Sequence, residues 1–186
     1  MGKIKVTENC NGIEGLKVIE PAVFGDARGY FFESWNKAAF AAAGIEADFV
    51  QDNESFSTYG VLRGLHYQMP PYTQAKLVRV IEGTVLDIVV DIRKGSPTFG
   101  RNVAVELSGE NKRQLFAPRG MAHGFAVLSA TATFAYKCDN IYAPTHERSI
   151  RFDDPKLGID WQIPPENYLL SEKDRKGVPF DEAEYL

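Results

Sequence analysis

Short runs of alternating apolar and polar residues, separated by glycine and proline, dominate the chain up to about residue 140. In residues 86–93 every second position, from Leu86 to Ile92, is leucine or a β-branched apolar residue, which is the period of a β-strand. Further strand-like runs are residues 15–26, 29–34, 75–93, 100–108 and 131–138. Strands this short and evenly spaced predict a sandwich or a closed barrel.

Two segments depart from this pattern. Residues 36–45 are rich in alanine and end near Gly44, which predicts a helix with a glycine close to its C-cap. Within residues 75–93, two strand-like runs meet at Glu82-Gly83-Thr84, which predicts a hairpin. After about residue 150 we expect loops and short helices packed on the barrel. We therefore expect one mostly β domain over residues 1–186, with an irregular C-terminal segment.

Composition and charge exclude several classes of function. The net charge is -4 and no basic cluster stands out, so nucleic acid is not an expected partner. No apolar stretch approaches the roughly 18 residues of a membrane span, and the N-terminus lacks a signal-peptide pattern. Cys10 and Cys138 show no disulfide-framework spacing, so reduced thiols are expected. We expect a cytoplasmic protein with no membrane partner.

The histidines raise the question of a metal site. His66 in LRGLHYQ and His123 in PRGMAHGF lie on separate expected strands, as the metal ligands of cupin proteins do. However, Gln68 stands where a second histidine would complete a His-x-His pair, and the nearby Lys76 would repel a divalent ion. About two ligands remain, fewer than the three of a typical catalytic zinc site. We therefore expect no metal and no cofactor.

His66 is either a packed core residue or a functional one. Residues 62–68 are more polar than a barrel core requires, since they include Arg63, His66 and Gln68. Arg63 and His66 have opposite strand parity, so a regular strand would point them apart. Gly64 between them could permit a bulge that turns both toward one cavity.

Other polar residues are ambiguous when their pattern alone is considered. Tyr136 shares an apolar face with Phe134 and Cys138, where it is either a core tyrosine or a phenol inside the barrel. Asp174 in SEKDRKG resembles an ordinary solvated charge. Residues 26–34 and 51–57 are polar and turn-like, and either segment could bind an anion or cap structure.

Longer motifs resemble the dTDP-4-dehydrorhamnose 3,5-epimerase family of cupin-type sugar-nucleotide epimerases. They follow the family's order from about residue 15 to 175, and they are DARGYFFES, QDNESFSTYGVLRGLHYQ, QAKLVRVIEGTVLDIVVDIRKGSPTFG, APRGMAHGF and YKCDNIYAPTHERSIRFDDPKLGIDW. The one departure is Met121, where phenylalanine is commoner, and both side chains are apolar.

The resemblance implies a metal-free jelly roll, a homodimer and a dTDP-linked 4-keto-6-deoxyhexose as substrate. The implied reaction is inversion of dTDP-4-dehydro-6-deoxy-glucose at carbons 3 and 5 to dTDP-4-dehydro-rhamnose, a step in dTDP-rhamnose biosynthesis for cell-surface polysaccharide. By position, the resemblance makes His66 the base, Asp174 its carboxylate partner, Tyr136 the acid and Lys76 the cation beside the carbonyl. Tyr142 matches the tyrosine that stacks on thymine. The other binding positions are Arg28, Glu33, Gln51, Asn53, Arg63, His123, Glu147 and Lys173.

The chemistry explains why these residue types are needed. Removing a proton next to a ketone leaves an enolate, so the site requires a base, an acid on the opposite face and a cation at the oxygen. Three alternatives remain open: an epimerase that inverts carbon 3 only, a metal-dependent cupin oxygenase and a non-catalytic sugar-nucleotide binder.

Overall fold

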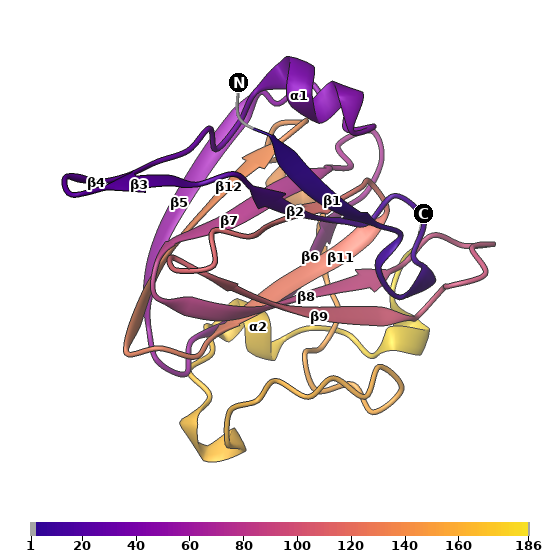
Figure 1. Cartoon of the computed structure of the whole chain (residues 1–186). Coiled ribbons are helices and arrows are strands. Elements are labelled where there is room, and N and C mark those ends of the chain that lie inside the picture. Colours follow the sequence, from indigo (N-terminus) through magenta and orange to yellow (C-terminus); the bar gives the residue numbers. More distant parts are fainter. Residues whose placement is uncertain (1–2, 186) are drawn as a thin grey trace.

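Residues 3–185 are described by a computed structural model, in which two packed β-sheets form the body (Figure 1). Within this range the six-stranded sheet has the order β1-β2-β10-β7-β12-β5 and the five-stranded sheet the order β13-β6-β11-β8-β9. The first sheet consists of β1 (Ile4–Glu8), β2 (Lys17–Pro21), β5 (Gln51–Thr58), β7 (Lys76–Glu82), β10 (Gln114–Ala117) and β12 (Thr131–Cys138). The second consists of β6 (Leu62–Gln68), β8 (Thr84–Asp91), β9 (Asn102–Ser108), β11 (Met121–Val127) and β13 (Glu147–Ser149). This is the expected cupin-type jelly roll.

The remaining elements are short. The helices are α1 (Lys37–Ala42) and α2 (Glu172–Arg175), and the 3-10 turns are η1 (Cys10–Gly12), η2 (Pro144–His146), η3 (Pro165–Asn167) and η4 (Phe180–Glu182). Helix α1 lies within the predicted segment 36–45. It begins after Asn36, whose side chain accepts the backbone N–H of Ala39, and Gly44 follows it with a φ of +73°. The loops and short helices expected after residue 150 are confirmed.

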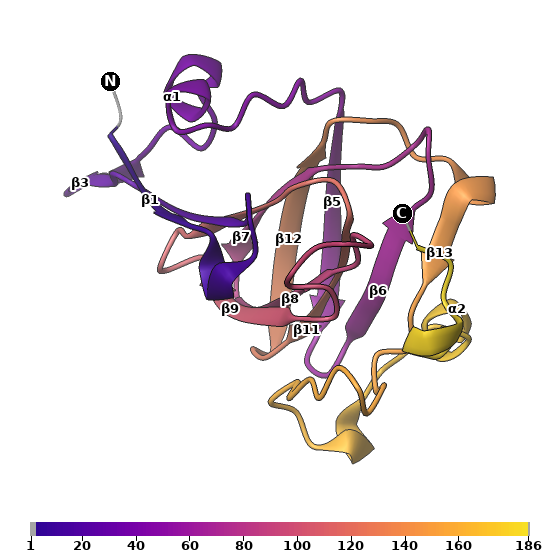
Figure 2. The ribbon, with the colours of Figure 1, turned by 90° about the vertical axis from the view of Figure 1, so that its right-hand side faces the viewer.

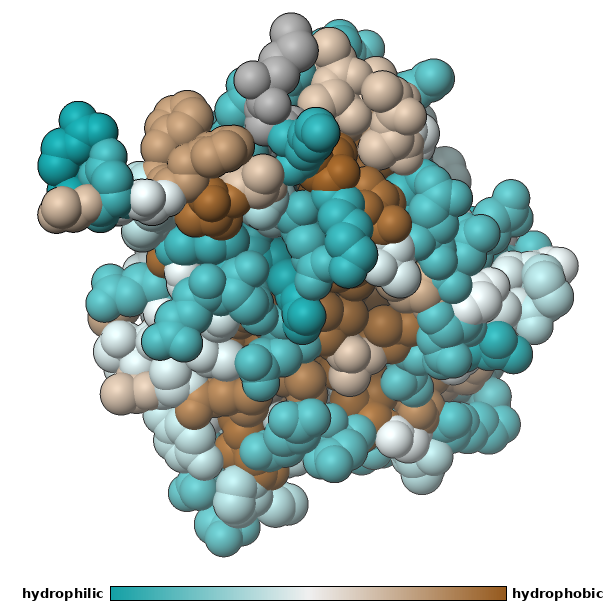
Figure 3. All heavy atoms as spheres, in the orientation of Figure 1, coloured by the Kyte–Doolittle hydropathy of each residue, from teal (hydrophilic) through white to brown (hydrophobic). Residues whose placement is uncertain are grey.

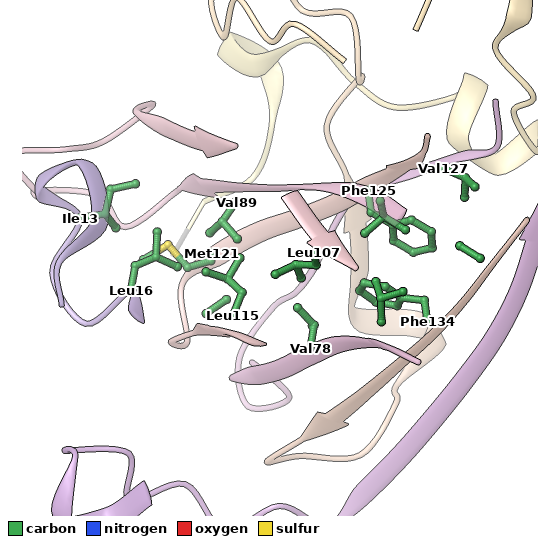
Figure 4. Packing of buried hydrophobic residues seen from close by; sticks show 14 residues of the cluster. Ile13, Leu16, Val78, Val89, Leu107, Leu115, Met121, Phe125, Val127 and Phe134 are labelled. Atoms are coloured by element: carbon green, nitrogen blue, oxygen red, sulfur yellow. The ribbon is translucent and has the colours of Figure 1, made fainter. Parts of the chain in front are cut away.

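Strand β8 is covered on both faces, since seven of its eight residues are buried. Val85 and Val89 belong to the core between the sheets, where Figure 4 shows Val89 close to side chains from β7 and β10. Leu86 and Ile88 pack on the other side against apolar side chains of the C-terminal segment, including Trp161. The alternation read from the sequence therefore separates two apolar cores, one inside the sandwich and one outside the second sheet.

The hairpin predicted within residues 75–93 is wrong. β7 pairs with β10 and β12, whereas β8 pairs with β9 and β11, so the chain passes from one sheet to the other at Gly83. Gly83 has a φ of +81°, and a Cβ there would lie 2.1 Å from the carbonyl oxygen of Thr131. A glycine turn between two strand-like runs is thus equally suited to a corner between sheets.

A thin hairpin of β3 (Phe24–Asp26) and β4 (Gly29–Phe31) projects from the body (Figure 1). In Figure 3 its tip is polar and its base more apolar. Phe24, Tyr30 and Phe31 are all more than half exposed. An apolar projection of this kind is typical of a protein–protein contact. Among residues 3–185, no helix is long and apolar enough to cross a membrane.

Candidate active site

A cavity of about 470 Å³ lies between the sheets and receives side chains from both. β6 and β11 contribute His66 and His123, whereas β7 and β12 contribute Lys76 and Tyr136. Asp174 reaches it from α2, which lies beside β6 and β13 outside the five-stranded sheet (Figure 2). The cavity therefore has ionisable groups on opposite walls.

A β-bulge at Gly64 brings Arg63 and His66 to the same cavity. His66 pairs with His123 and Arg63 with Phe125, so three steps along β6 oppose two along β11. Gly64 has a φ of +124°, and a Cβ there would lie 2.6 Å from the Cα of Gly124. Only glycine fits this approach of the two strands, and the bulge proposed from the sequence is confirmed.

His66 is partly exposed and pairs with a buried carboxylate, that of Asp174. Nε2 of His66 lies 2.8 Å from Oδ1 of Asp174. The same oxygen accepts the backbone N–H of Gly64 at 3.0 Å, and the hydroxyl of Ser171 donates to Oδ2 at 2.5 Å. Burial raises the pKa of Asp174, but the close contact with His66 and the hydrogen bonds from Ser171 and Gly64 outweigh it and lower the pKa to about 2.

Asp174 is therefore a carboxylate at neutral pH. It is only 4 % exposed, so the interpretation of this residue as an ordinary solvated charge is wrong. Burial of a carboxylate is tolerated here because both of its oxygens accept hydrogen bonds.

A buried pair joins His123 to Asp87. Nε2 of His123 lies 3.0 and 2.9 Å from the two carboxylate oxygens of Asp87, which is fully buried on β8. Burial raises the pKa of Asp87, and the neighbouring His123 and Lys76 partly oppose this. The pair fixes which ring nitrogen of His123 remains for other contacts.

Lys76 and Tyr136 lie together on the opposite wall. Nζ of Lys76 is 5.8 Å from the centre of the Tyr136 ring. Burial lowers the pKa of Lys76, whereas the neighbouring Cys138, Asp87 and Glu147 favour its charged form. Burial raises the pKa of Tyr136, so the phenol keeps its proton at neutral pH.

Hydrogen bonds link five of the sequence-predicted binding residues along one side of the cavity. Asn53 accepts from the Gln51 side-chain amide at 2.9 Å, and the Gln51 carbonyl oxygen accepts the backbone N–H of Tyr142 at 2.9 Å. The Tyr142 hydroxyl donates to Glu147 at 2.8 Å, and Glu147 pairs with Lys173 at 2.5 Å. Tyr142 is half exposed, which leaves it available to a flat ligand.

Arg28 and Glu33 lie outside the cavity. Arg28 pairs with Asp26 at 2.5 Å on the projecting hairpin, and Glu33 accepts a hydrogen bond from Asn36 at 3.3 Å. Neither residue lines the cavity of its own chain. Their assignment to the substrate site stays a prediction.

Gln68, in the position of a possible metal ligand, is fully occupied by the backbone. Its amide nitrogen donates to the carbonyls of Tyr72 and Ile141, and its oxygen accepts the N–H of Ala143. Across the described residues, no group of three or more histidine, cysteine, aspartate or glutamate side chains is placed to hold a metal ion.

Sequence reasoning missed Asp87 and Ser171 as members of the site. The signal for Asp87 was present, because a lone carboxylate inside the apolar run TVLDIVV calls for a buried partner. Ser171 carries no such signal, since a serine three residues before an aspartate is also an ordinary helix cap.

The fold and the cavity together define a jelly roll of the cupin type whose interior carries acid–base side chains. The chain belongs to the dTDP-4-dehydrorhamnose 3,5-epimerase family, whose model matches residues 11–182. A relative of that name from Shigella flexneri is 55% identical over 175 residues, which cover 94% of this chain and 96% of the relative.

Two solved structures extend the comparison. The epimerase of Legionella pneumophila, solved with dTDP-4-keto-L-rhamnose, has a TM-score of 0.92 and 51% identity and covers 97% of this chain and 95% of its own. A 3'-monoepimerase from Streptomyces bikiniensis, solved with dTDP-quinovose, has a TM-score of 0.81 and 37% identity over 89% of this chain and 84% of its own.

Proposed function

We propose that this protein inverts carbons 3 and 5 of dTDP-4-dehydro-6-deoxy-glucose to give dTDP-4-dehydro-rhamnose. The observation that carries the proposal is the single cavity in which the His66–Asp174 pair faces the wall that bears Lys76 and Tyr136. Membership of the epimerase family supports the choice of substrate. The protein is then an isomerase that requires no cofactor.

His66 acts as the base. Because its Nε2 is engaged with ionised Asp174, the lone pair that accepts the substrate proton is on Nδ1. The carboxylate then stabilises the imidazolium that forms after proton removal. A histidine suits this step because its unperturbed pKa lies near neutrality.

Lys76 and Tyr136 complete the reaction from the other wall. The Lys76 ammonium stabilises the enolate oxygen, and a lowered pKa makes its proton easier to share with that oxygen. Tyr136 returns a proton from the face opposite His66. Since these two residues come from the six-stranded sheet and His66 from the five-stranded one, the base and the acid reach different faces of a sugar held between them.

The polar side chains along the cavity bind the nucleotide. Arg63, which lines the cavity, makes a forked contact with the diphosphate, while Tyr142 stacks its ring on thymine. His123, held by Asp87, contacts the sugar. The proposal includes a homodimer in which the projecting segment with Arg28 and Glu33 meets the neighbouring chain.

A single domain over residues 1–186 and a cytoplasmic location complete the proposal. Cys10 and Cys138 are free thiols, which supports a reducing compartment.

The test is incubation with dTDP-4-keto-6-deoxyglucose in deuterated water, followed by NMR. The wild type should gain deuterium at carbons 3 and 5, whereas His66→Asn should exchange at neither carbon. Tyr136→Phe should still exchange but lose inversion by at least about 10²-fold, most severely at carbon 5. Exchange in His66→Asn, or near wild-type inversion in Tyr136→Phe, would refute these roles.

Inversion of carbon 3 alone is the second candidate. The likeness to a 3'-monoepimerase, at a TM-score of 0.81, favours keeping it. Both reactions use the same base, so the two candidates differ in what happens at carbon 5. If the wild-type enzyme incorporates no deuterium at carbon 5, inversion of carbon 3 alone is the function.

A further inference from the structure

Ser171 makes two hydrogen bonds with one residue, Asp174. As the N-cap of α2, its Oγ accepts the backbone N–H of Asp174 at 3.1 Å. The same hydroxyl donates its proton to Oδ2 of the Asp174 carboxylate at 2.5 Å. A serine that only capped the helix would need the first bond and not the second.

The two oxygens of Asp174 are held from different elements. Oδ1 is held by β6, through the N–H of Gly64 at 3.0 Å and Nε2 of His66 at 2.8 Å. Oδ2 is held by Ser171 from the segment before α2. A carboxylate held at both oxygens cannot rotate about its Cβ–Cγ bond. Helix α2 has four residues, too few for a helix to be stable by itself, so side-chain contacts decide where it lies.

We propose that Ser171 is a positioning residue for the base, which it serves by donating a hydrogen bond to Oδ2 of Asp174. This inference rests on the proposed function, in which His66 removes the substrate proton. The bond fixes the plane of the carboxylate against the imidazole. It also draws negative charge toward Oδ2, which limits how strongly Oδ1 holds a proton on His66.

Loss of the bond changes the base in a defined direction. Without the Ser171 donor, more charge remains on Oδ1, so the imidazolium that forms on His66 is held more tightly. The acid limb of the pH–rate profile therefore moves to higher pH. Other charged or titratable groups that line the same cavity or adjoin Asp174 are Glu54, Arg63, Tyr67, Lys76, His123 (paired with Asp87), Tyr136, Cys138, Tyr142, Glu147, Lys173 and Arg175. Substitution of Ser171 leaves all of these side chains in place.

Three substitutions separate the role of Ser171 as a hydrogen-bond donor to Asp174 from its role as the N-cap of α2. Alanine is a poor N-cap, whereas glycine caps nearly as well as serine, and neither can donate. Threonine keeps both bonds. If the hydrogen bond from Ser171 to Asp174 matters, Ser171→Ala and Ser171→Gly should both shift the acid limb of the kcat/KM profile to higher pH by about half a pH unit. Both should also lower kcat about tenfold, and Ser171→Thr should restore both values.

Ser96 supplies the matched control. Its hydroxyl donates to Oδ2 of Asp91 at 2.7 Å, and Asp91 is fully buried outside the cavity. Ser96→Ala therefore removes a serine–aspartate hydrogen bond of the same type and should leave the pH profile unchanged. A similar shift in Ser96→Ala would overturn the inference.

The outcomes distinguish this inference from the proposed function. If the wild type neither exchanges nor inverts the substrate, the proposed function fails. If it does, but the Ser171→Gly profile superimposes on that of the wild type, the function stands and the inference fails. A loss in Ser171→Ala that Ser171→Gly does not share, with no shift of the acid limb, would identify Ser171 as a helix cap alone. Should Ser171→Ala fail to fold, Ser171→Gly carries the test.

Discussion

Replacement of Asp174 by asparagine tests the central pair in both stability and catalysis. Asparagine keeps the size of the side chain but cannot carry the negative charge that pairs with His66 and accepts hydrogen bonds from Ser171 and Gly64. In the catalytic assay, an amide cannot stabilise the imidazolium that forms when His66 removes a proton. Activity should fall by about 10²–10⁴-fold.

The stability effect follows from the pKa of Asp174. Folding lowers this pKa from its ordinary value of 3.8 to about 2, and each pKa unit corresponds to about 1.4 kcal/mol. The ionised carboxylate thus contributes about 2 kcal/mol to the free energy of unfolding. Because the folded pKa is depressed, this contribution is fully present above the unfolded pKa near 4. It is lost as the pH falls through about 2.

The measurement is urea unfolding of wild type and Asp174→Asn between pH 7 and pH 2, at equal protein concentration. The free energy of unfolding of the wild type should exceed that of Asp174→Asn by about 2 kcal/mol near neutral pH, and this difference should shrink below pH 4. Asp153→Asn is the control, since Asp153 pairs with Arg151 at the surface, where an ion pair contributes less than about 1 kcal/mol. A difference that stayed constant down to pH 2, or no difference at all, would refute the reasoning.

Three further predictions concern the bulge, the cofactor and the assembly. In urea unfolding, Gly64→Ala should lower the free energy of unfolding by about 3 kcal/mol or more, because its Cβ would lie 2.6 Å from the Cα of Gly124. The control is Gly95→Ala, which is also at positive φ but in open space and should cost about 1–2 kcal/mol. A chelator should leave epimerisation unchanged, and loss of activity restored by one divalent ion would contradict this. Sedimentation at micromolar concentration should give twice the chain mass of 20.7 kDa, and a monomer would exclude the homodimer.

The strands with an alternating apolar face were predictable because a sandwich strand has period two. Residues 51–57, which were interpreted as polar and turn-like, instead belong to the edge strand β5 (Gln51–Thr58). The segment 131–138 coincides with β12, and its inward face holds Phe134 and Cys138 as expected. The pairing of strands was less predictable. Periodicity states which residues share a face, but it does not say which sheet a strand joins, and the corner at Gly83 was therefore mistaken for a hairpin.

Site residues were predictable where residues close to them in the sequence pointed to the same function. His66, Arg63 and Gly64 lie within four residues, so their density and spacing pointed to a bulge and a shared cavity. Asp174 lies 108 positions after His66 in an exposed-looking segment, and only the family resemblance linked the two. No local pattern encodes a contact over such a separation.

The N–H of Gly64 lies on the side of β6 that faces the C-terminal segment. Two residues earlier, the N–H of Leu62 donates to the carbonyl oxygen of Leu169, so the N–H groups of this parity point away from β11. The N–H of Gly64 donates to Asp174, which approaches from α2 beside β6. The C-terminal segment is anchored by its apolar contacts with the outer face of β8. The backbone of β6 therefore binds the carboxylate partner of His66, and the outer core holds that partner in reach.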